Sequence, residues 1–175
     1  MATDKRIKKA VMIIAFEKFR DEEYLKPKQI LEQAGIEITT ASTQKGIARG
    51  KLGAQVIVDI LLKQIKVTDY DAIIFIGGPG SYAFFDDPTA HNLAREAIKE
   101  QKILGGICAA AAILAKAGAL AGKKAACFVG VADILKEKGA LYSPAGLEVD
   151  GKTVTADGPE QAKGFGEELV KLING

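Results

Sequence analysis

The stretch Lys102-Ile-Leu-Gly-Gly-Ile-Cys-Ala-Ala-Ala-Ala-Ile-Leu-Ala-Lys-Ala117 decides the fold. Its first half, Lys102 to Cys108, is a short apolar run that is typical of a strand buried on both faces. Its second half, Ala109 to Ala117, is rich in alanine, the best helix former, and Gly118 follows as a cap. The sequence therefore predicts a sharp strand-to-helix turn at Cys108, the unit from which α/β proteins are built.

The same alternation runs along the rest of the chain. Strands are predicted at 9–16, 36–41, 71–77, 102–108 and 124–129, helices at 21–33, 87–101, 109–117, 133–138 and 159–173, a hairpin within 45–65, and two strands over 147–155 that turn at Asp150-Gly151. Strands separated by helices need right-handed crossovers, which place helices on both faces of a mostly parallel sheet. We therefore expect a three-layer α/β/α sandwich. No repeat, linker or charge block marks a boundary, so residues 1–175 are expected to form one domain.

The composition excludes several classes of protein. A net charge of +2 lacks the basic excess that nucleic-acid binding needs, and two cysteines are too few for a disulfide scaffold. No apolar stretch approaches the ~20 residues that span a bilayer, and the start MATDKRIKKAVMIIAF has no cleavage-like segment. We expect a soluble protein of the reducing cytoplasm with no membrane or nucleic-acid partner. One histidine and two cysteines in separate segments form no known metal-ligand spacing, and no cofactor is indicated.

Residues at the ends of parallel strands have the best prospect of function, and Cys108 stands at such a position. Its small neighbours resemble those that let a nucleophile stand free of the backbone at a strained elbow. The N-terminus of the following helix would favour the thiolate and lower the pKa of Cys108. The alternative is a cysteine that packs as a small hydrophobic residue among the alanines.

Two further strand ends are followed by residues that could take part in catalysis. Gly77-Gly78-Pro79-Gly80 follows the strand at 71–77, and its N–H groups could form half of an oxyanion hole. It could equally be a plain turn, and it lacks the Lys-Ser/Thr ending of a phosphate loop. The acidic run 21–23 follows the first strand, where acids usually favour a helix start, so only one of them need have another role.

In combination these three segments resemble the DJ-1/PfpI superfamily, also called ThiJ/PfpI. The resemblance rests on Glu23 four residues before Pro27, the strand end Gly77-Gly78 and the pair Ile107-Cys108, in that order. It implies a flavodoxin-like fold and a homodimer. It also implies that Glu23 is a partly protonated carboxyl that hydrogen-bonds the sulfur of Cys108.

The chain departs from this family where a histidine would serve as base. Ala109 follows the cysteine where peptidase-type members have histidine, and Phe128 occupies the position from which a histidine approaches the thiol in the DJ-1 branch. The single histidine, His91, falls on the helix predicted after the glycine loop. A PfpI-type cysteine peptidase is therefore disfavoured, because its thiol needs a general base within hydrogen-bond reach.

These residues predict a cysteine-dependent enzyme that acts on small 2-oxoaldehydes or their adducts, as a glyoxalase or deglycase does. Cys108 and Glu23 would be catalytic, and the backbone N–H groups of Gly78 and Ala109 would bind the oxyanion. The alternative is a stress-protective redox sensor in which an oxidant converts Cys108 to a sulfenic or sulfinic acid. Cys127 is predicted to lie in the strand at 124–129, to face away from the site and to be inert.

Overall fold

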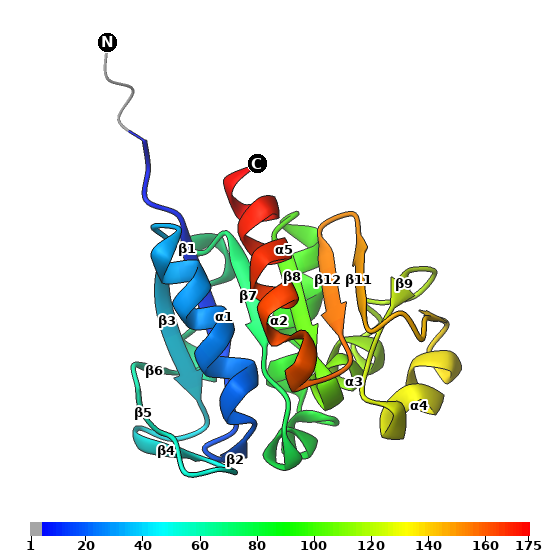
Figure 1. Ribbon diagram of the computed structural model, residues 1–175, viewed down its shortest axis with the longest axis horizontal. Helices are drawn as coiled ribbons and strands as arrows, with labels where there is room; N and C mark the ends of the chain where they lie inside the picture. Colours follow the sequence, from blue (N-terminus) through cyan, green and yellow to red (C-terminus); the bar gives the residue numbers. More distant parts are fainter. Residues whose placement is uncertain (1–4) are drawn as a thin grey trace.

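A seven-stranded sheet forms the centre of the computed structural model, which describes residues 5–175 (Figure 1). The order is β11-β12-β8-β7-β1-β3-β6, and every neighbouring pair is parallel except β11 and β12. The strands are β1 (Lys9–Ile13), β3 (Glu37–Ser42), β6 (Ile60–Leu61), β7 (Ala72–Phe75), β8 (Ile103–Ile107), β11 (Leu147–Asp150) and β12 (Thr153–Ala156). The expectation of no targeting segment involves residues 1–4, which lie outside the described part.

Helices cover both faces of this sheet, which confirms the predicted three-layer α/β/α sandwich. The helices α1 (Asp21–Gln33) and α5 (Ala162–Asn174) pack against each other on one face, and α2 (Pro88–Lys99) and α3 (Ala111–Lys116) pack on the other (Figure 1). Short 3-10 helices occupy Leu62–Gln64, Val67–Asp69, Pro79–Phe84, Cys108–Ala110, Val129–Val131 and Pro159–Gln161. Within residues 5–175 we find no helix with both the length and the apolarity that crossing a membrane requires.

The paired glycines of β8 let helices approach this strand closely from both sides. A methyl group on Gly106 would lie 2.7 Å from Cδ1 of Leu114 on α3, and one on Gly105 would lie 3.1 Å from Cζ of Phe165 on α5. Both distances are shorter than ordinary contacts between packed carbon atoms. The thin sandwich at β8 therefore requires glycine, and it seats α3 directly behind the turn at Cys108.

Two smaller sheets flank the central one. The strands β2 (Glu17–Phe19), β4 (Gly46–Gly50) and β5 (Gln55–Val58) form a three-stranded sheet in which β4 and β5 make the predicted hairpin. On the other side β9 (Lys124–Ala125) pairs only with β10 (Leu141–Tyr142), next to α4 (Ala132–Glu137).

The strand predicted over 124–129 is therefore wrong beyond Ala125. The Ala126 N–H donates to the side-chain Oγ1 of Thr155 at 2.9 Å instead of to a backbone carbonyl of β12. The Phe128 N–H donates to the Cys108 carbonyl at 3.2 Å, and a 3-10 helix begins at the next residue. Side-chain and turn contacts thus replace the ladder that the apolar run suggested.

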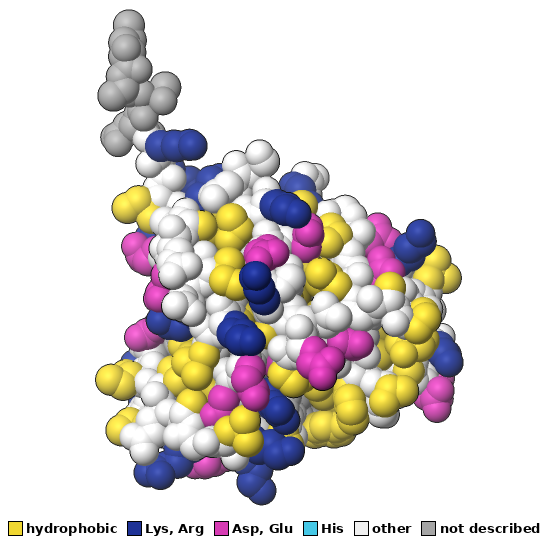
Figure 2. Space-filling model, in the orientation of Figure 1, with side chains coloured by type: hydrophobic (Ala, Val, Ile, Leu, Met, Phe, Trp, Pro, Cys, Tyr) yellow, Lys and Arg dark blue, Asp and Glu magenta, His cyan; other side chains and the backbone are white. Residues whose placement is uncertain are grey.

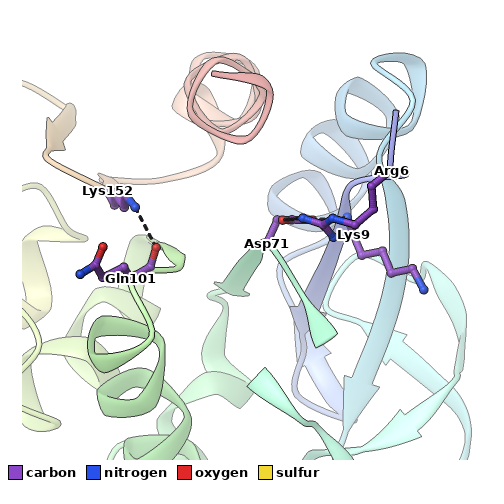
Figure 3. A network of polar contacts seen from close by, with 5 residues as sticks. All are labelled: Arg6, Lys9, Asp71, Gln101 and Lys152. Carbon is purple, nitrogen blue, oxygen red and sulfur yellow. Dashed lines mark hydrogen bonds and ion pairs between the residues drawn. The ribbon is translucent and has the colours of Figure 1, made fainter. Parts of the chain in front are cut away.

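Polar contacts tie the amino ends of the strands together, at the edge opposite the carboxyl ends. Asp71, just before β7, accepts hydrogen bonds from Arg6 at 2.6 Å and from the Lys9 N–H at 2.8 Å (Figure 3). Lys152, before β12, donates to the Gln101 carbonyl at 3.0 Å. Burial favours the neutral carboxyl of Asp71, but Arg6 and the Lys9 N–H outweigh it and lower its pKa.

Candidate active site

Cys108 lies at the carboxyl end of β8, on the turn between this strand and the helix behind it. Its φ angle is 61°, a left-handed conformation that residues other than glycine rarely adopt. Such a backbone costs free energy and is found most often at functional positions. The turn projects the thiol beyond the end of the sheet, as a nucleophile elbow does.

Three neighbouring strands deliver the predicted residues to one place. In the sheet the strands lie in the order β3-β1-β7-β8, so the chain first moves from β1 to one side and then crosses to the other side at β7. Ligands of open α/β sheets bind at such a switch point. Glu23 enters from the first turn of α1, Gly77 and Gly78 follow β7, and Cys108 follows β8. The structure thus brings Glu23, Gly78, Cys108 and Ala109 together at one cavity.

Gly77 makes room for the carboxyl and the thiol to face each other. A methyl group at this residue would lie 2.6 Å from Glu23 Oε1 and 2.8 Å from Cys108 Cβ. The next residue, Gly78, has a φ of 104° and packs against the backbone of Lys18 and Arg20. A side chain at either glycine would push Glu23 away from the sulfur or the loop away from β2.

Glu23, in the first turn of α1, is a fully buried carboxyl. Neither of its oxygens has a well-aligned hydrogen-bond partner among residues 5–175. Burial raises its pKa from 4.5 to about 7, although the Cys108 side chain, the Arg20 guanidinium and the Gly77 N–H act in the opposite direction. The carboxyl therefore exchanges its proton near neutral pH.

The prediction of an acidic Cys108 thiol is wrong in this structure. Burial and the negative charge of Glu23 raise its pKa to about 12, whereas the N–H groups of Ala109 and Gly78 lower it by less. The helix dipole is weak here because α3 has only six residues behind one 3-10 turn. Glu23 and Cys108 behave as a pair that keeps one proton above neutral pH, and a thiolate forms when that proton moves to the carboxyl.

The cavity over Cys108 has a volume of about 350 Å³ and walls of mixed character. Tyr82 and Phe128 form an apolar side, and the ring of Tyr82 stacks on Phe85 with centroids 4.5 Å apart. Arg20 and Lys51 supply positive charge. The remaining wall residues are Glu23, Gly78, Pro79, Ala109, Asp157 and Pro159. Sequence reasoning missed Arg20 and Lys51 as wall residues, since only the flanking glycines of Lys51 hinted at a tight turn.

The second cysteine and the histidine lie apart from this chemistry. Cys127 is buried and absent from the cavity wall, and burial, followed by the charge of Asp157, raises its pKa to about 12. Neither Cys127 nor Cys108 forms a disulfide. The His91 ring nitrogen Nε2 contacts the Phe85 carbonyl at 2.6 Å, so this side chain has a structural partner. Among the described residues no cluster of metal-ligating side chains is present.

The fold and the site define an α/β protein with a cysteine on a strained strand-to-helix turn. The sequence matches the DJ-1/PfpI family over residues 8–172, and the chain belongs to this family. It is 29% identical to the deglycase PfpI of Pyrococcus furiosus over 163 residues, which cover 93% of this chain and 98% of that one. The glutathione-independent glyoxalase DJR-1.2 of Caenorhabditis elegans is 26% identical over 168 residues, 96% of this chain and 90% of the relative.

A solved structure shows the same architecture. The crystal structure of a ThiJ/PfpI domain protein from Brachyspira murdochii superposes with a TM-score of 0.95 at 30% sequence identity. The match covers 97% of this chain and 98% of the other. The flavodoxin-like fold expected from the sequence resemblance is thereby confirmed.

Proposed function

We propose that this protein converts small 2-oxoaldehydes, or the adducts they form, in the manner of a glyoxalase or deglycase. The observation that carries the proposal is the buried Glu23 carboxyl, which has no well-aligned hydrogen-bond partner in the described part of the chain and faces Cys108 on its strained turn. A carboxyl with a pKa of about 7 is suited to moving a proton to and from a thiol. The relatives named deglycase and glyoxalase support the same class of substrate.

The first step is addition of the thiol to the aldehyde. The Cys108 proton moves to the Glu23 carboxylate, and the S–C bond forms as the C=O π pair moves to oxygen. The N–H groups of Gly78 and Ala109, which already face the sulfur, stabilise the negative oxygen. Glu23 then returns the proton to that oxygen, which gives a hemithioacetal.

The later steps need no external oxidant. The Glu23 carboxylate removes the proton from the former aldehyde carbon to give an enediolate. Glu23 returns this proton to the neighbouring carbon while the hydroxyl proton on the former aldehyde carbon passes to the neighbouring oxygen. One carbon is oxidised to a thioester while the other is reduced to an alcohol. Water then cleaves the thioester, which releases a 2-hydroxy acid and restores the Cys108 thiol. An aldehyde adduct on an amine enters this sequence once its C–N bond has broken.

The alternative function is that of a redox sensor. Cys108 is partly exposed in the cavity, and the N–H groups of Gly78 and Ala109 face its sulfur. A peroxide could therefore reach the thiolate, break its own O–O bond and leave a sulfenic acid. Either activity needs Cys108 as a free thiol, which fits the cytoplasm as the setting that we propose. The peptidase alternative stays disfavoured, since no histidine lines the cavity.

An assay with methylglyoxal separates these functions. We expect the wild type to form lactate over many turnovers, Cys108→Ser to form none, and Glu23→Gln to lose at least about a hundredfold in rate, as general acid–base catalysis implies. Peroxide consumption in a one-to-one ratio, together with no lactate, would favour the sensor instead. Mass spectrometry of the same samples would show whether Cys108 has been oxidised.

We also propose that the protein is a homodimer. The hairpin of β4 and β5 presents a cross-strand pair, Ile47 and Ile57, with 48% and 74% of their surface exposed, and Leu52 at its turn is 61% exposed. Hydrophobic side chains emerge over this hairpin at the left edge of Figure 2. Analytical ultracentrifugation should give a dimer that Ile57→Lys weakens and Ile98→Lys, on α2, leaves intact. A monomeric wild type would refute the proposal.

A further inference from the structure

A second cavity adjoins the one over Cys108 and is lined by cations. It has a volume of about 460 Å³ and shares Lys51 and Pro79 with the first cavity as wall residues. Its charged lining consists of Lys18, Arg49 and Lys51 against a single acid, Glu17. Lys and Arg side chains gather along the lower edge of the molecule, beneath β2 and β4 (Figure 2). Lys51 and Pro79 thus form a wall common to the two cavities, and we call the two adjoining cavities together the groove.

The cations of this groove are not neutralised by neighbouring acids. Within residues 5–175 no carboxylate lies within ion-pair distance of Lys18, Arg49 or Lys51. Arg20, on the wall of the first cavity, differs because it pairs with Glu22 at 2.7 Å. Unpaired cations that share one concave surface raise the local concentration of anions. The groove therefore has positive charge available for a ligand.

The backbone that carries Lys51 is held firmly in place. Asp21, a buried residue at the start of α1, accepts hydrogen bonds from the N–H groups of Leu52 at 2.8 Å and Ala54 at 2.7 Å. The Lys51 N–H donates to the Phe19 carbonyl at 2.8 Å. A turn fixed from both sides sets the place where the Lys51 side chain leaves the backbone before any ligand arrives, so the backbone loses little entropy on binding.

The backbone of the neighbouring strand β2 is a second indication that this cavity binds a ligand. Lys18 has a φ of 61°, a left-handed backbone at a residue other than glycine. Its backbone packs against Gly78 of the loop that faces Cys108, so the strained residue links the basic cavity to the thiol site. Strain of this kind persists only where surrounding contacts enforce it, and it is common at ligand-binding positions.

We infer that the cavity formed by Lys18, Arg49 and Lys51 binds an anionic group, a carboxylate or a phosphate, on the carbonyl compound that reacts with Cys108. This inference deepens the proposed function, because the anion belongs to the substrate of the same thiol. The carbonyl carbon would lie at the sulfur, the apolar side of the first cavity would cover the carbon chain, and the anion would extend past Pro79 to the lysines and the arginine. The preferred substrates are then acidic oxo compounds rather than neutral methylglyoxal.

Alkylation of Cys108 tests this inference without any turnover. Iodoacetate and iodoacetamide differ in charge at nearly the same size. The ratio of the iodoacetate rate to the iodoacetamide rate therefore reports the electrostatic potential in the groove. We expect Lys51→Met and Arg49→Met each to lower the ratio about three- to tenfold, chiefly through the iodoacetate rate. Lys99→Met is the matched control, since it removes an equal charge from the end of α2. Added salt should lower the ratio in the wild type more than in the variants.

The outcomes separate the inference from the proposed function. An unchanged ratio in both Lys51→Met and Arg49→Met, or an equal fall in Lys99→Met, would overturn the anion site even if methylglyoxal is turned over. A fall confined to the groove variants would support it even if no turnover is found. Protection of Cys108 by inorganic phosphate, compared with acetate at equal ionic strength, identifies which of the two anions the groove prefers.

Discussion

Replacing Glu23 by glutamine should abolish the loss of stability that the wild type undergoes as the pH rises from 4 to 8, while the protein loses reactivity. The folded-state pKa of this carboxyl is raised from 4.5 to about 7. An acid with a raised pKa favours the folded state fully below its unfolded pKa, and this contribution is lost as the pH rises through the folded value. The shift corresponds to about 3 kcal/mol of the free energy of unfolding between pH 4 and pH 8. Glu23→Gln does not titrate and so escapes that loss.

The assay is urea unfolding of both proteins at pH 4 and pH 8. An unpaired amide in the buried site would cost the variant about 1–3 kcal/mol at either pH, so the change between the two values is the diagnostic quantity. We expect the variant to gain about 3 kcal/mol on the wild type from pH 4 to pH 8. Glu22→Gln is the control, because the hydrogen bond from Arg20 lowers the pKa of Glu22 and reverses the sign. An equal difference at both pH values for Glu23→Gln would refute the reasoning.

Three other changes have defined outcomes. Gly77→Ala should push Glu23 away from Cys108 and lower the alkylation rate of the thiol severalfold, with the circular dichroism spectrum unchanged; an unaltered rate would show that the close approach is unimportant. Limiting iodoacetamide at pH 6 should label Cys108 before the buried Cys127, and peptide mapping that found equal labelling would contradict the assigned burial. Asp87→Ala removes the N-cap of α2 and should cost about 1 kcal/mol in chemical denaturation, without effect on methylglyoxal turnover.

Local patterns predicted the parts of the fold that depend on local physics. The predicted helix at 21–33 matches α1, because Gly35, with a φ of 82°, follows the helix and breaks it. The β11–β12 hairpin forms as predicted, but it turns at Gly151-Lys152, one residue later than the predicted Asp150-Gly151. The strand predicted at 124–129 does not extend beyond Ala125, because the Ala126 N–H donates to the hydroxyl of Thr155, a residue distant in the sequence. A periodicity argument contains no information about such a contact.

In the candidate site, too, some features follow from the sequence and others depend on contacts between residues that are distant in the sequence. The positions of Cys108, Glu23 and the glycine loop follow from the ends of parallel strands and from the family resemblance. The direction of the thiol pKa did not follow, because it depends on how deeply the Cys108–Glu23 pair is buried. The basic groove was also missed, since it exists only when Asp21 holds a turn that lies 31 and 33 residues further along the chain. Both are tertiary effects.

The position of the C-terminus has a practical use. The last helix, α5, ends on the side of the molecule where β7 begins, near Asp71 (Figure 1). The residues that line the cavity over Cys108 follow the opposite, carboxyl ends of β7 and β8. A tag or linker attached after Gly175 would therefore hold the molecule on a sensor chip or resin with its reactive thiol turned toward the flowing solution. The same orientation would let a fusion partner be added at this end without blocking the access of substrate to the groove.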